Sequence, residues 1–253
     1  MRKGSPQIER VREHSRSLVY NCLLERPGER LSRNDISWAT GLSNPTVSTL
    51  LQEFANLSLI DEVGHSSARG GRPAQLVSFN PSASCVLSID LAVRGARALL
   101  VDLAGTVLER QEGPAFGEGQ TEELFEWLAD LHSRWSASRR LGRVAVSLPG
   151  VIEHNSGTVH LAPALGWHNY PLAERLSRHL GLPVTLENDV NALALGELRY
   201  GDVDPQINAM FLSITSGVGM GLVLEGRIYR GSHYAAGEVG YSQYSHLTSG
   251  AEF

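Results

Sequence analysis

Residues 31–48, LSRNDISWATGLSNPTVS, contain the local signals that set the architecture of the first third of the chain. Ser32 and Asp35 have the spacing of a capping box, in which each side chain satisfies the other residue's backbone N–H at the start of a helix. That helix is expected to end at Gly41. A further helix is expected to begin at the serine and asparagine before Pro45, because proline is favoured in a first helical turn. The stretch therefore predicts two helices joined by a glycine turn. The second of these helices is expected to bury one apolar face: Val47, Leu50, Leu51 and Phe54.

A helix is expected before this pair and a hairpin after it. Apolar residues spaced by three and four predict an amphipathic helix over residues 10–25. Segments 59–64 and 75–79 are typical of strands, and the polar, Gly-rich run 66–73 between them indicates a loop at the tip of a hairpin. This order of helices and hairpin is that of a winged helix-turn-helix. We therefore predict a DNA-binding domain over residues 1–80.

The predicted partner of this domain is double-stranded DNA. In a winged helix-turn-helix the polar start of the third helix enters the major groove, and the wing reaches the backbone or the minor groove. The predicted contact residues lie on the two helices and in the wing: Arg33, Asn44, Thr46, Ser48, Arg69 and Arg72. The alternative interpretation is a small helical subdomain with a solvated polar face. The two wing arginines flank two glycines, which allow close approach to a phosphate backbone and favour DNA.

The charge distribution agrees with this division. Up to Phe79 the sequence has 10 basic and 8 acidic residues, a net charge of +2. The remaining 12 basic and 19 acidic residues give the rest of the chain a net charge of −7. A positive first third is consistent with binding to nucleic acid, and an acidic remainder is not expected to touch DNA.

The remainder, residues 81–253, has the pattern of an α/β layer structure. Strands are predicted at 86–91, 96–102, 107–110, 144–148, 184–187, 209–215 and 221–224, and helices at 122–136, 172–180 and 190–200. Asn188 and Asp189 follow a predicted strand, and ligands of α/β folds bind at the carboxyl ends of strands. These side chains are candidates for binding hydroxyl groups, although an Asn-Asp helix cap is the simpler interpretation. The Gly-rich run 216–221 could present N–H groups to a phosphate or form a tight turn.

Composition excludes several classes of protein. The chain has 253 residues, of which 42% are hydrophobic, and no apolar run approaches the roughly 18 residues that a membrane-spanning helix needs. The charged N-terminus lacks the apolar core of a signal peptide, so we expect a cytoplasmic protein with no membrane partner. Cys22 and Cys85 are far from any CxxC spacing and are expected to be buried, reduced thiols with no metal or redox role.

Four ordered motifs of the second domain complete a recognisable pattern: LPGVI at 148–152, APALGW at 162–167, ENDVNA at 187–192, and a Gly231-(x5)-Gly-Glu-Val-Gly240 segment. With the helix-turn-helix stretch and Gly71-Arg-Pro73 before them, the whole chain resembles the ROK family of sugar-responsive repressors and sugar kinases. The resemblance implies an α/β fold, with an N-terminal winged helix-turn-helix followed by an actin-like, hexokinase-like (ribonuclease H-like) domain. It also implies that the second lobe of that domain is incomplete in this chain.

Departures from the family's kinase motifs argue against an enzyme. Kinases of the family open the domain with Asp-x-Gly-Gly-Thr, whereas this chain has Asp90-Leu-Ala-Val-Arg94. The second phosphate turn, Gly-Thr-Gly-x-Gly in kinases, is Thr215-Ser-Gly-Val-Gly219 here. Asp189 matches the catalytic base of the kinases, but it is expected to have no ATP to act with. We therefore expect neither catalysis nor a cofactor.

The zinc motif of the family is also altered. In relatives a Glu-x-Gly-His segment supplies a zinc-binding histidine together with downstream cysteines. Here the segment ends in Tyr241, and no cysteine follows Cys85. The sequence therefore predicts that this chain holds no metal.

The resemblance implies a sequence-specific DNA-binding regulator of sugar metabolism genes, and a repressor in particular. Asn188, Asp189 and Glu238 would bind the hydroxyls of a sugar or sugar phosphate effector, and a full-length domain would form a homodimer. Two alternatives stay open at this point. One is a sugar kinase with a DNA-binding domain, and the other is a degenerate regulator that binds DNA and no sugar.

Overall fold

The computed structural model describes residues 6–66, 73–92, 95–115, 119–204, 206–215 and 217–241. It divides into two compact units. The first consists of Met1–Cys85 together with Val101–Thr106, and the second of Val86–Leu100 together with Val107–Phe253.

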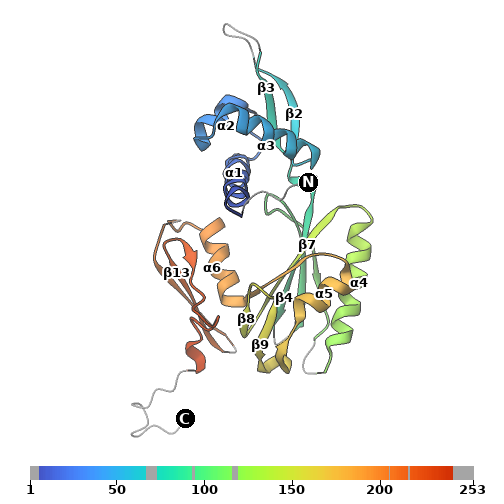
Figure 1. Cartoon of the computed structure of the whole chain (residues 1–253). Helices are drawn as coiled ribbons and strands as arrows, with labels where there is room; N and C mark the ends of the chain where they lie inside the picture. Colours follow the sequence, from blue (N-terminus) through green and yellow to red (C-terminus); the bar gives the residue numbers. More distant parts are fainter. Residues whose placement is uncertain are drawn as a thin grey trace. The chain divides into compact units, whose positions relative to one another are not determined.

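The first unit combines three helices with a small antiparallel sheet (Figure 1). Its elements are α1 (Pro6–Leu24), β1 (Leu31–Ser32), α2 (Arg33–Thr40), α3 (Asn44–Asn56), β2 (Ile60–His65) and β3 (Gln75–Phe79), followed by a 3-10 turn at Pro81–Ala83. The strands have the order β1-β3-β2, and both pairings are antiparallel. This is the predicted winged helix-turn-helix arrangement, with β2 and β3 forming the wing hairpin.

The helix ends are capped as the sequence predicts. Ser32 Oγ accepts a hydrogen bond from the backbone N–H of Asp35 at 3.3 Å, and Asp35 Oδ2 accepts one from the N–H of Ser32 at 2.8 Å. Gly41 ends α2 with a φ of 70°, a left-handed conformation that favours glycine. Ser43, not Asn44, caps α3 by accepting from the N–H of Thr46. The turn between the two helices is therefore set by local interactions.

Replacing Ser32 with alanine is expected to destabilise the first unit by about 1 kcal/mol, because the backbone N–H of Asp35 in the first turn of α2 loses its side-chain acceptor. Urea unfolding followed by circular dichroism would measure this change. Ser17→Ala is the matched control, since the exposed Ser17 hydroxyl only donates to the carbonyl of Glu13 within α1. Equal stabilities of the two variants would contradict the role of the cap.

An apolar core holds the first unit together. Val47, Leu50 and Phe54 of α3 are buried in it, as their spacing predicts. Leu51, which was also expected inside, is half-buried and packs at the edge of this core. Cys22 lies in this core and Cys85 is also buried, so the predicted burial of both cysteines is confirmed; the two do not form a disulfide.

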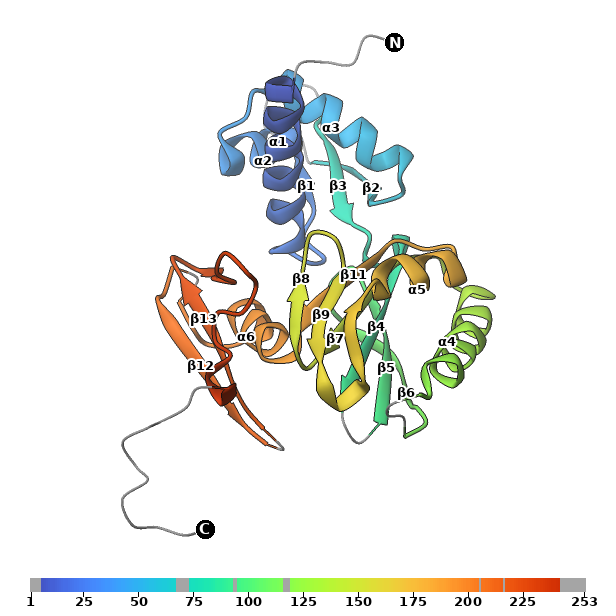
Figure 2. The same ribbon diagram turned by 60° about the horizontal axis from the view of Figure 1, so that its bottom comes forward.

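The second unit is built on a five-stranded sheet with the order β11-β7-β4-β5-β6. The elements up to α6 are β4 (Cys85–Ala92), β5 (Gly95–Asp102), β6 (Val107–Glu112), α4 (Thr121–Ser136), β7 (Leu141–Leu148), β8 (Val151–Glu153), β9 (Thr158–Ala162), β10 (Trp167–Tyr170), α5 (Leu172–Leu180), β11 (Val184–Asn188) and α6 (Asp189–Tyr200). β11 runs parallel to β7. Helices α4 and α5 lie on one side of the sheet and α6 on the other (Figures 1 and 2). A three-strand meander extended by parallel strands beside its first strand is the ribonuclease H-like topology.

Strands β8, β9 and β10 form a separate antiparallel sheet, in the order β10-β9-β8, that the sequence did not predict. Each strand has only three to five residues. Their burial does not alternate cleanly, so a period of two cannot be detected in them. Cross-strand pairing stabilises these segments, and pairing depends on tertiary structure.

A second antiparallel sheet follows α6 and consists of β12 (Ala209–Ile214), β13 (Val218–Leu224) and β14 (Arg227–Ile228), in that order. α6 packs against β13 through two glycines of the Gly-rich run. An added Cβ at Gly219 would lie 2.8 Å from Val190 Cγ2, and one at Gly221 would lie 3.1 Å from Ala194 Cβ. Gly219 and Gly221 therefore serve close packing of a strand on a helix, which is a role that the sequence analysis did not consider.

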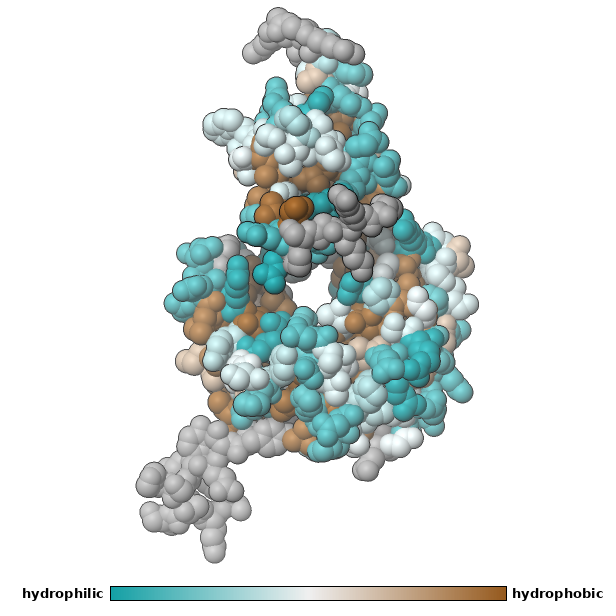
Figure 3. Space-filling model, viewed as in Figure 1, coloured by the Kyte–Doolittle hydropathy of each residue, from teal (hydrophilic) through white to brown (hydrophobic). Residues whose placement is uncertain are grey.

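The other face of this small sheet carries exposed apolar side chains. Met210, Leu212 and Ile214 of β12 are 71%, 59% and 71% exposed. Their cross-strand partners on β13 are Leu222, Met220 and Val218. Apolar surface of the lobe that contains α6 and β13 is visible in brown in Figure 3. The alternation of β12 thus places one set of its side chains toward α6 and the other at the surface.

Candidate functional site

A cavity of about 320 Å³ lies in the second unit at the carboxyl ends of β7 and β11. Its walls come from the turn after β7, the start of α6, the small sheet and the segment after β14: Pro149, Gly150, Asn188, Asp189, Val190, Ser213, Thr215, Gly217, Val218, Gly219, Met220, Glu238 and Gly240. The three residues predicted to bind a ligand, Asn188, Asp189 and Glu238, therefore line a single cavity. Glu238 comes from a segment that is distant from the other two in sequence.

Asn188 caps α6, so the simpler interpretation of this residue is correct. Its Oδ1 accepts hydrogen bonds from the backbone N–H groups of Val190 at 2.9 Å and Asn191 at 3.1 Å. Its Nδ2 donates to the carbonyl oxygen of Gly150 at 3.1 Å. One amide hydrogen remains for a ligand. Asn188 thus ties the start of α6 to the turn after β7 and shapes the cavity in addition to lining it.

Two carboxyl groups in the cavity have raised pKa values. Burial raises the pKa of Asp189, and the nearby charge of Asp90 raises it further, although the backbone N–H of Val190 favours the charged form. Burial also raises the pKa of Glu238, and the charge of Asp189 adds to this effect. The Asp90 carboxylate itself accepts a hydrogen bond from Ser147 Oγ at 3.0 Å. The cavity therefore presents poorly hydrated acceptor oxygens, which are suited to the hydroxyl hydrogens of a sugar.

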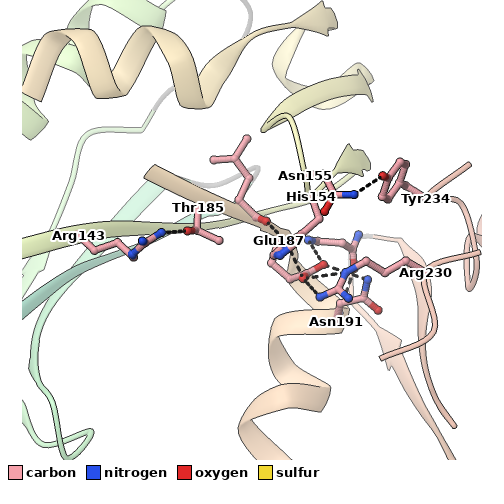
Figure 4. Close-up of polar contacts among 10 residues, drawn as sticks. Arg143, His154, Asn155, Thr185, Glu187, Asn191, Arg230 and Tyr234 are labelled. Carbon is pink, nitrogen blue, oxygen red and sulfur yellow. Dashed lines mark hydrogen bonds and ion pairs between the residues drawn. The ribbon is translucent and has the colours of Figure 1, made fainter. Parts of the chain in front are cut away.

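Beside the cavity lies an ion pair that the sequence analysis missed (Figure 4). Glu187, the residue before Asn188, accepts hydrogen bonds from the guanidinium of Arg230, with Arg230 Nε at 3.1 Å from Oε2. Its other oxygen accepts from Asn191 Nδ2 at 3.2 Å and from the backbone N–H of Asn188 at 3.1 Å. Glu187 was quoted within a motif, but Arg230 lies 43 residues away. No local signal connects the two.

The described residues show no group of three His, Cys, Asp or Glu side chains that could hold a metal ion. The altered segment that replaces the kinase glycines falls at the end of β4, and its residues 93–94 lie outside the described part of the chain. In the second phosphate turn, Thr215 and Gly217 line the cavity while Ser216 is likewise outside the described part.

The predicted DNA contacts of the first unit fall into three groups. Arg33 and Asn44 line one groove of about 490 Å³, together with Asn34, His65, Pro73, Ala74 and Gln75. Arg33 Nη1 donates to Ser48 Oγ at 2.8 Å, which links α2 to α3, and Ser48 lines a second groove that Arg33 also lines. Thr46 instead exchanges a hydrogen bond with the cap Ser43, their hydroxyl oxygens being 2.8 Å apart. Arg69 and Arg72 lie outside the described residues.

The groove also contains residues that the sequence analysis did not select. Asn34, His65 and Gln75 are polar and lie beside Arg33 and Asn44. Asn34 follows a predicted contact directly, whereas His65 and Gln75 are paired across the base of the wing and come together through strand pairing. Polarity next to a predicted contact was the only signal for Asn34.

Together, the strand order, the cavity at the carboxyl ends of the strands and the three-helix unit with its hairpin define an actin-like, ribonuclease H-like protein with a winged helix-turn-helix at its N-terminus. The chain belongs to the ROK family, whose family model matches residues 86–250.

Curated relatives of this chain include transcriptional repressors. It is 31% identical to the xylose repressor of Caldicellulosiruptor bescii over 92% of this chain and 59% of the relative. It is 25% identical to the DNA-binding transcriptional dual regulator NagC of Escherichia coli over 93% of this chain and 59% of that protein. The chain thus spans about three fifths of the length of these relatives.

Solved structures give the same family. A ROK family transcriptional regulator, described as a homolog of the E. coli MLC protein, has a TM-score of 0.80 at 27% identity and covers 94% of this chain, which matches 61% of that structure. A ROK family glucokinase from Streptomyces griseus, solved with glucose and AMPPNP, has a TM-score of 0.57 at 24% identity and covers 64% of this chain and 51% of its own. The glucokinase shares the fold of part of the chain.

In the part of the chain that the structure describes, no helix is long and apolar enough to cross a membrane.

Proposed function

We propose that this chain acts as a sequence-specific DNA-binding transcriptional regulator, a repressor of sugar metabolism genes that responds to a sugar or sugar phosphate. One observation supports this function over a kinase. The similarity to a ROK regulator structure covers 94% of the chain, whereas the similarity to the glucokinase covers 64%. The repressor-like relatives therefore extend over the winged helix-turn-helix as well as the sugar-kinase-like domain.

Residues 1–80 form the proposed DNA-binding domain. Arg33, Asn44 and Ser48 occupy neighbouring positions on α2 and α3, where a winged helix-turn-helix presents side chains to the major groove. Arg69 and Arg72 are proposed to contact phosphates or the minor groove from the wing. Thr46 is assigned mainly to the start of α3, because its hydroxyl is bonded to Ser43.

Residues 81–253 form the proposed sensor domain, with Asp189 and Glu238 accepting hydrogen bonds from sugar hydroxyls and Asn188 donating its free amide hydrogen. An effector would act by shifting the populations of two arrangements of the DNA-binding domains in a homodimer of the full-length protein. Such a regulator works in the cytoplasm. It needs no catalysis, and we assign Asp189 to binding; phosphorylation of a sugar by this chain with ATP would overturn that assignment.

Removing the wing arginine, in an Arg72→Ala variant, is expected to weaken binding to operator DNA. It should also make the salt dependence shallower by about one unit in the slope of log K against log salt, because one phosphate contact is lost. Fluorescence anisotropy with labelled duplexes selected from random sequence would measure both quantities. Arg139→Ala, which removes an exposed arginine from the sensor domain, is the control. Identical affinities and slopes for Arg72→Ala and Arg139→Ala would remove the wing from the proposal.

Calorimetric titration with a panel of pentoses, hexoses, amino sugars and their phosphates separates a working sensor from a regulator that binds no sugar. We expect a single class of sugar to bind the isolated chain. Binding of none, while duplex DNA still binds, would support the degenerate regulator.

A further inference from the structure

The segment that carries Glu238 is held by side chains of the large five-stranded sheet and its neighbouring turn. Arg230, which follows β14 closely, forms the ion pair with Glu187 at the end of β11. Four residues later, Tyr234 Oη accepts a hydrogen bond from Asn155 Nδ2, in the turn between β8 and β9, at 3.1 Å. These two contacts connect segment 230–238 to two different places in the rest of the second unit (Figure 4).

Hydrogen bonds within segment 230–238, and between this segment and β13, join the two contacts to the cavity. The carbonyl oxygen of Arg230 accepts a hydrogen bond from the N–H of Ala236 at 3.2 Å, which closes the segment on itself. The carbonyl oxygen of Gly237 then accepts from the N–H of Met220 on β13 at 3.0 Å. Glu238 follows directly and lines the cavity. A displacement of Arg230 would therefore be transmitted to Glu238 through a short and internally bonded loop.

Glu187 is connected to the wall of the cavity that carries Asn188 and Asp189. Its Oε1 accepts from the backbone N–H of Asn188, whose side chain caps α6, and from Asn191 Nδ2 within α6. The Glu187 side chain is 13% exposed and that of Arg230 is 27% exposed, so the pair is shielded from water. A shielded, charge-assisted pair is stronger than one on the surface, and it leaves an uncompensated charge when one partner is removed.

We propose that the Arg230–Glu187 pair is a tether that sets the separation of the two walls of the sugar cavity, with Glu238 on one wall and Asn188 and Asp189 on the other. Arg230 is a positioning residue in this arrangement, because it acts on the ligand through Glu238. The inference deepens the proposed sensor function and rests on it. It predicts that the tether controls how well the cavity is organised before any sugar arrives.

Hydrogen exchange of the unliganded full chain tests the tether without needing a ligand. Arg230→Gln is expected to speed amide exchange in peptides covering residues 231–238 on the order of tenfold, because the segment opens locally without its ion pair. Arg230→Lys, which keeps the charge, should recover part of the protection. Arg227→Gln is the matched control, since it removes an exposed arginine three positions earlier.

The pairwise nature of the tether is tested by a double-mutant cycle with Glu187→Gln. Amide exchange in the Arg230→Gln/Glu187→Gln double variant should be about as fast as in either single variant, because both substitutions remove the same interaction. It should be slower than the rate obtained by multiplying the two single effects. Sugar affinity should fall on the order of tenfold in Arg230→Gln, as expected for the loss of about one well-placed hydrogen bond to the ligand. It should stay unchanged in Arg227→Gln, with both variants measured at a temperature at which they are fully folded.

The possible outcomes separate the tether from the proposed function. Exchange rates in Arg230→Gln that match those of Arg227→Gln would overturn the tether. Independent, multiplicative effects of the two glutamine substitutions would overturn the pairing. If the panel contains no sugar that binds the unaltered chain, the sensor function fails, and the exchange measurements still decide whether the tether holds segment 231–238.

Discussion

Asp189→Asn is expected to weaken sugar binding roughly 10- to 150-fold, as follows from losing one charge-assisted hydrogen bond, and to make the unliganded protein more stable at neutral pH. The two effects have one cause. The Asp189 carboxylate is partly buried and lies near the Asp90 charge, and both raise its pKa and disfavour its ionised form. A sugar hydroxyl that donates to this oxygen would supply a hydrogen bond in place of the hydration lost on burial.

The sign of the stability effect follows from the pKa. The folded-state pKa of Asp189 is raised above the value in the unfolded chain, which is about 3.9 for an aspartate. The corresponding stability is fully present below that unfolded pKa and is lost as the pH rises through the folded pKa. The Asp189→Asn variant keeps its stability as the pH rises, because its amide does not ionise. The difference in melting temperature between Asp189→Asn and the unaltered chain should therefore grow as the pH rises from about 4 and then level off.

Thermal unfolding across this pH range, together with calorimetric titration of the sugar, measures both effects. Asp202→Asn is the control, because it removes an exposed aspartate just after α6. The interpretation would be wrong if Asp189→Asn lowered the melting temperature at pH 7, or if it bound the sugar as tightly as Asp202→Asn does.

Gly237→Ala is expected to cost about 2–5 kcal/mol of stability, combining left-handed strain with overpacking, and to abolish measurable sugar binding. Gly237 has a φ of +89°, and a Cβ added there would overlap the carbonyl oxygen of Met220 and lie 2.8 Å from its carbonyl carbon. The obstacle is backbone, so it cannot move aside as a flexible side chain could. The strand β13 and the segment carrying Glu238 would have to separate.

Gly181→Ala provides the comparison for this effect. Gly181 ends α5 with a φ of +68°, and nothing lies within 4 Å of an added Cβ. Gly181→Ala should cost only about 1–2 kcal/mol from left-handed backbone strain, with sugar affinity unchanged. Urea unfolding would measure the stability of both variants, and calorimetric titration would measure their sugar affinity. Similar losses of stability in the two variants would show that the contact with Met220 does not control this segment.

Much of the first unit could be predicted because its signals are local. The capping box of Ser32 and Asp35 and the end of α2 at Gly41 each involve residues within one or two helical turns. The same holds for the buried face of α3, apart from Leu51 at its edge. Helical periodicity reports which side chains face a core, although it does not say how far that core extends.

In the second unit, several elements depend on contacts between distant residues and could not be predicted from local signals. The short strands β8 to β10 were missed because only their pairing stabilises them. The Gly-rich run suggested a turn or a phosphate site, yet Gly219 and Gly221 lie within β13 and allow α6 to approach. The alternating apolar residues of β12 would predict a buried face for a strand of this kind, but which face is covered depends on where α6 packs.

The amino-acid sequence predicted most helix ends, the order of the two architectures along the chain, the family and three residues that line the cavity. These follow from spacing and from motifs, which are contacts and patterns over a few residues. The predicted start of α1 was wrong, because this helix begins at Pro6 and not at residue 10. The packing of the second unit, in contrast, places Glu238 and Asp189 in one cavity, uses the amide oxygen of Asn188 to cap α6, and pairs Arg230 with Glu187. Such arrangements join residues far apart in the chain, and only the packing of the sheets and α6 brings them within hydrogen-bonding distance.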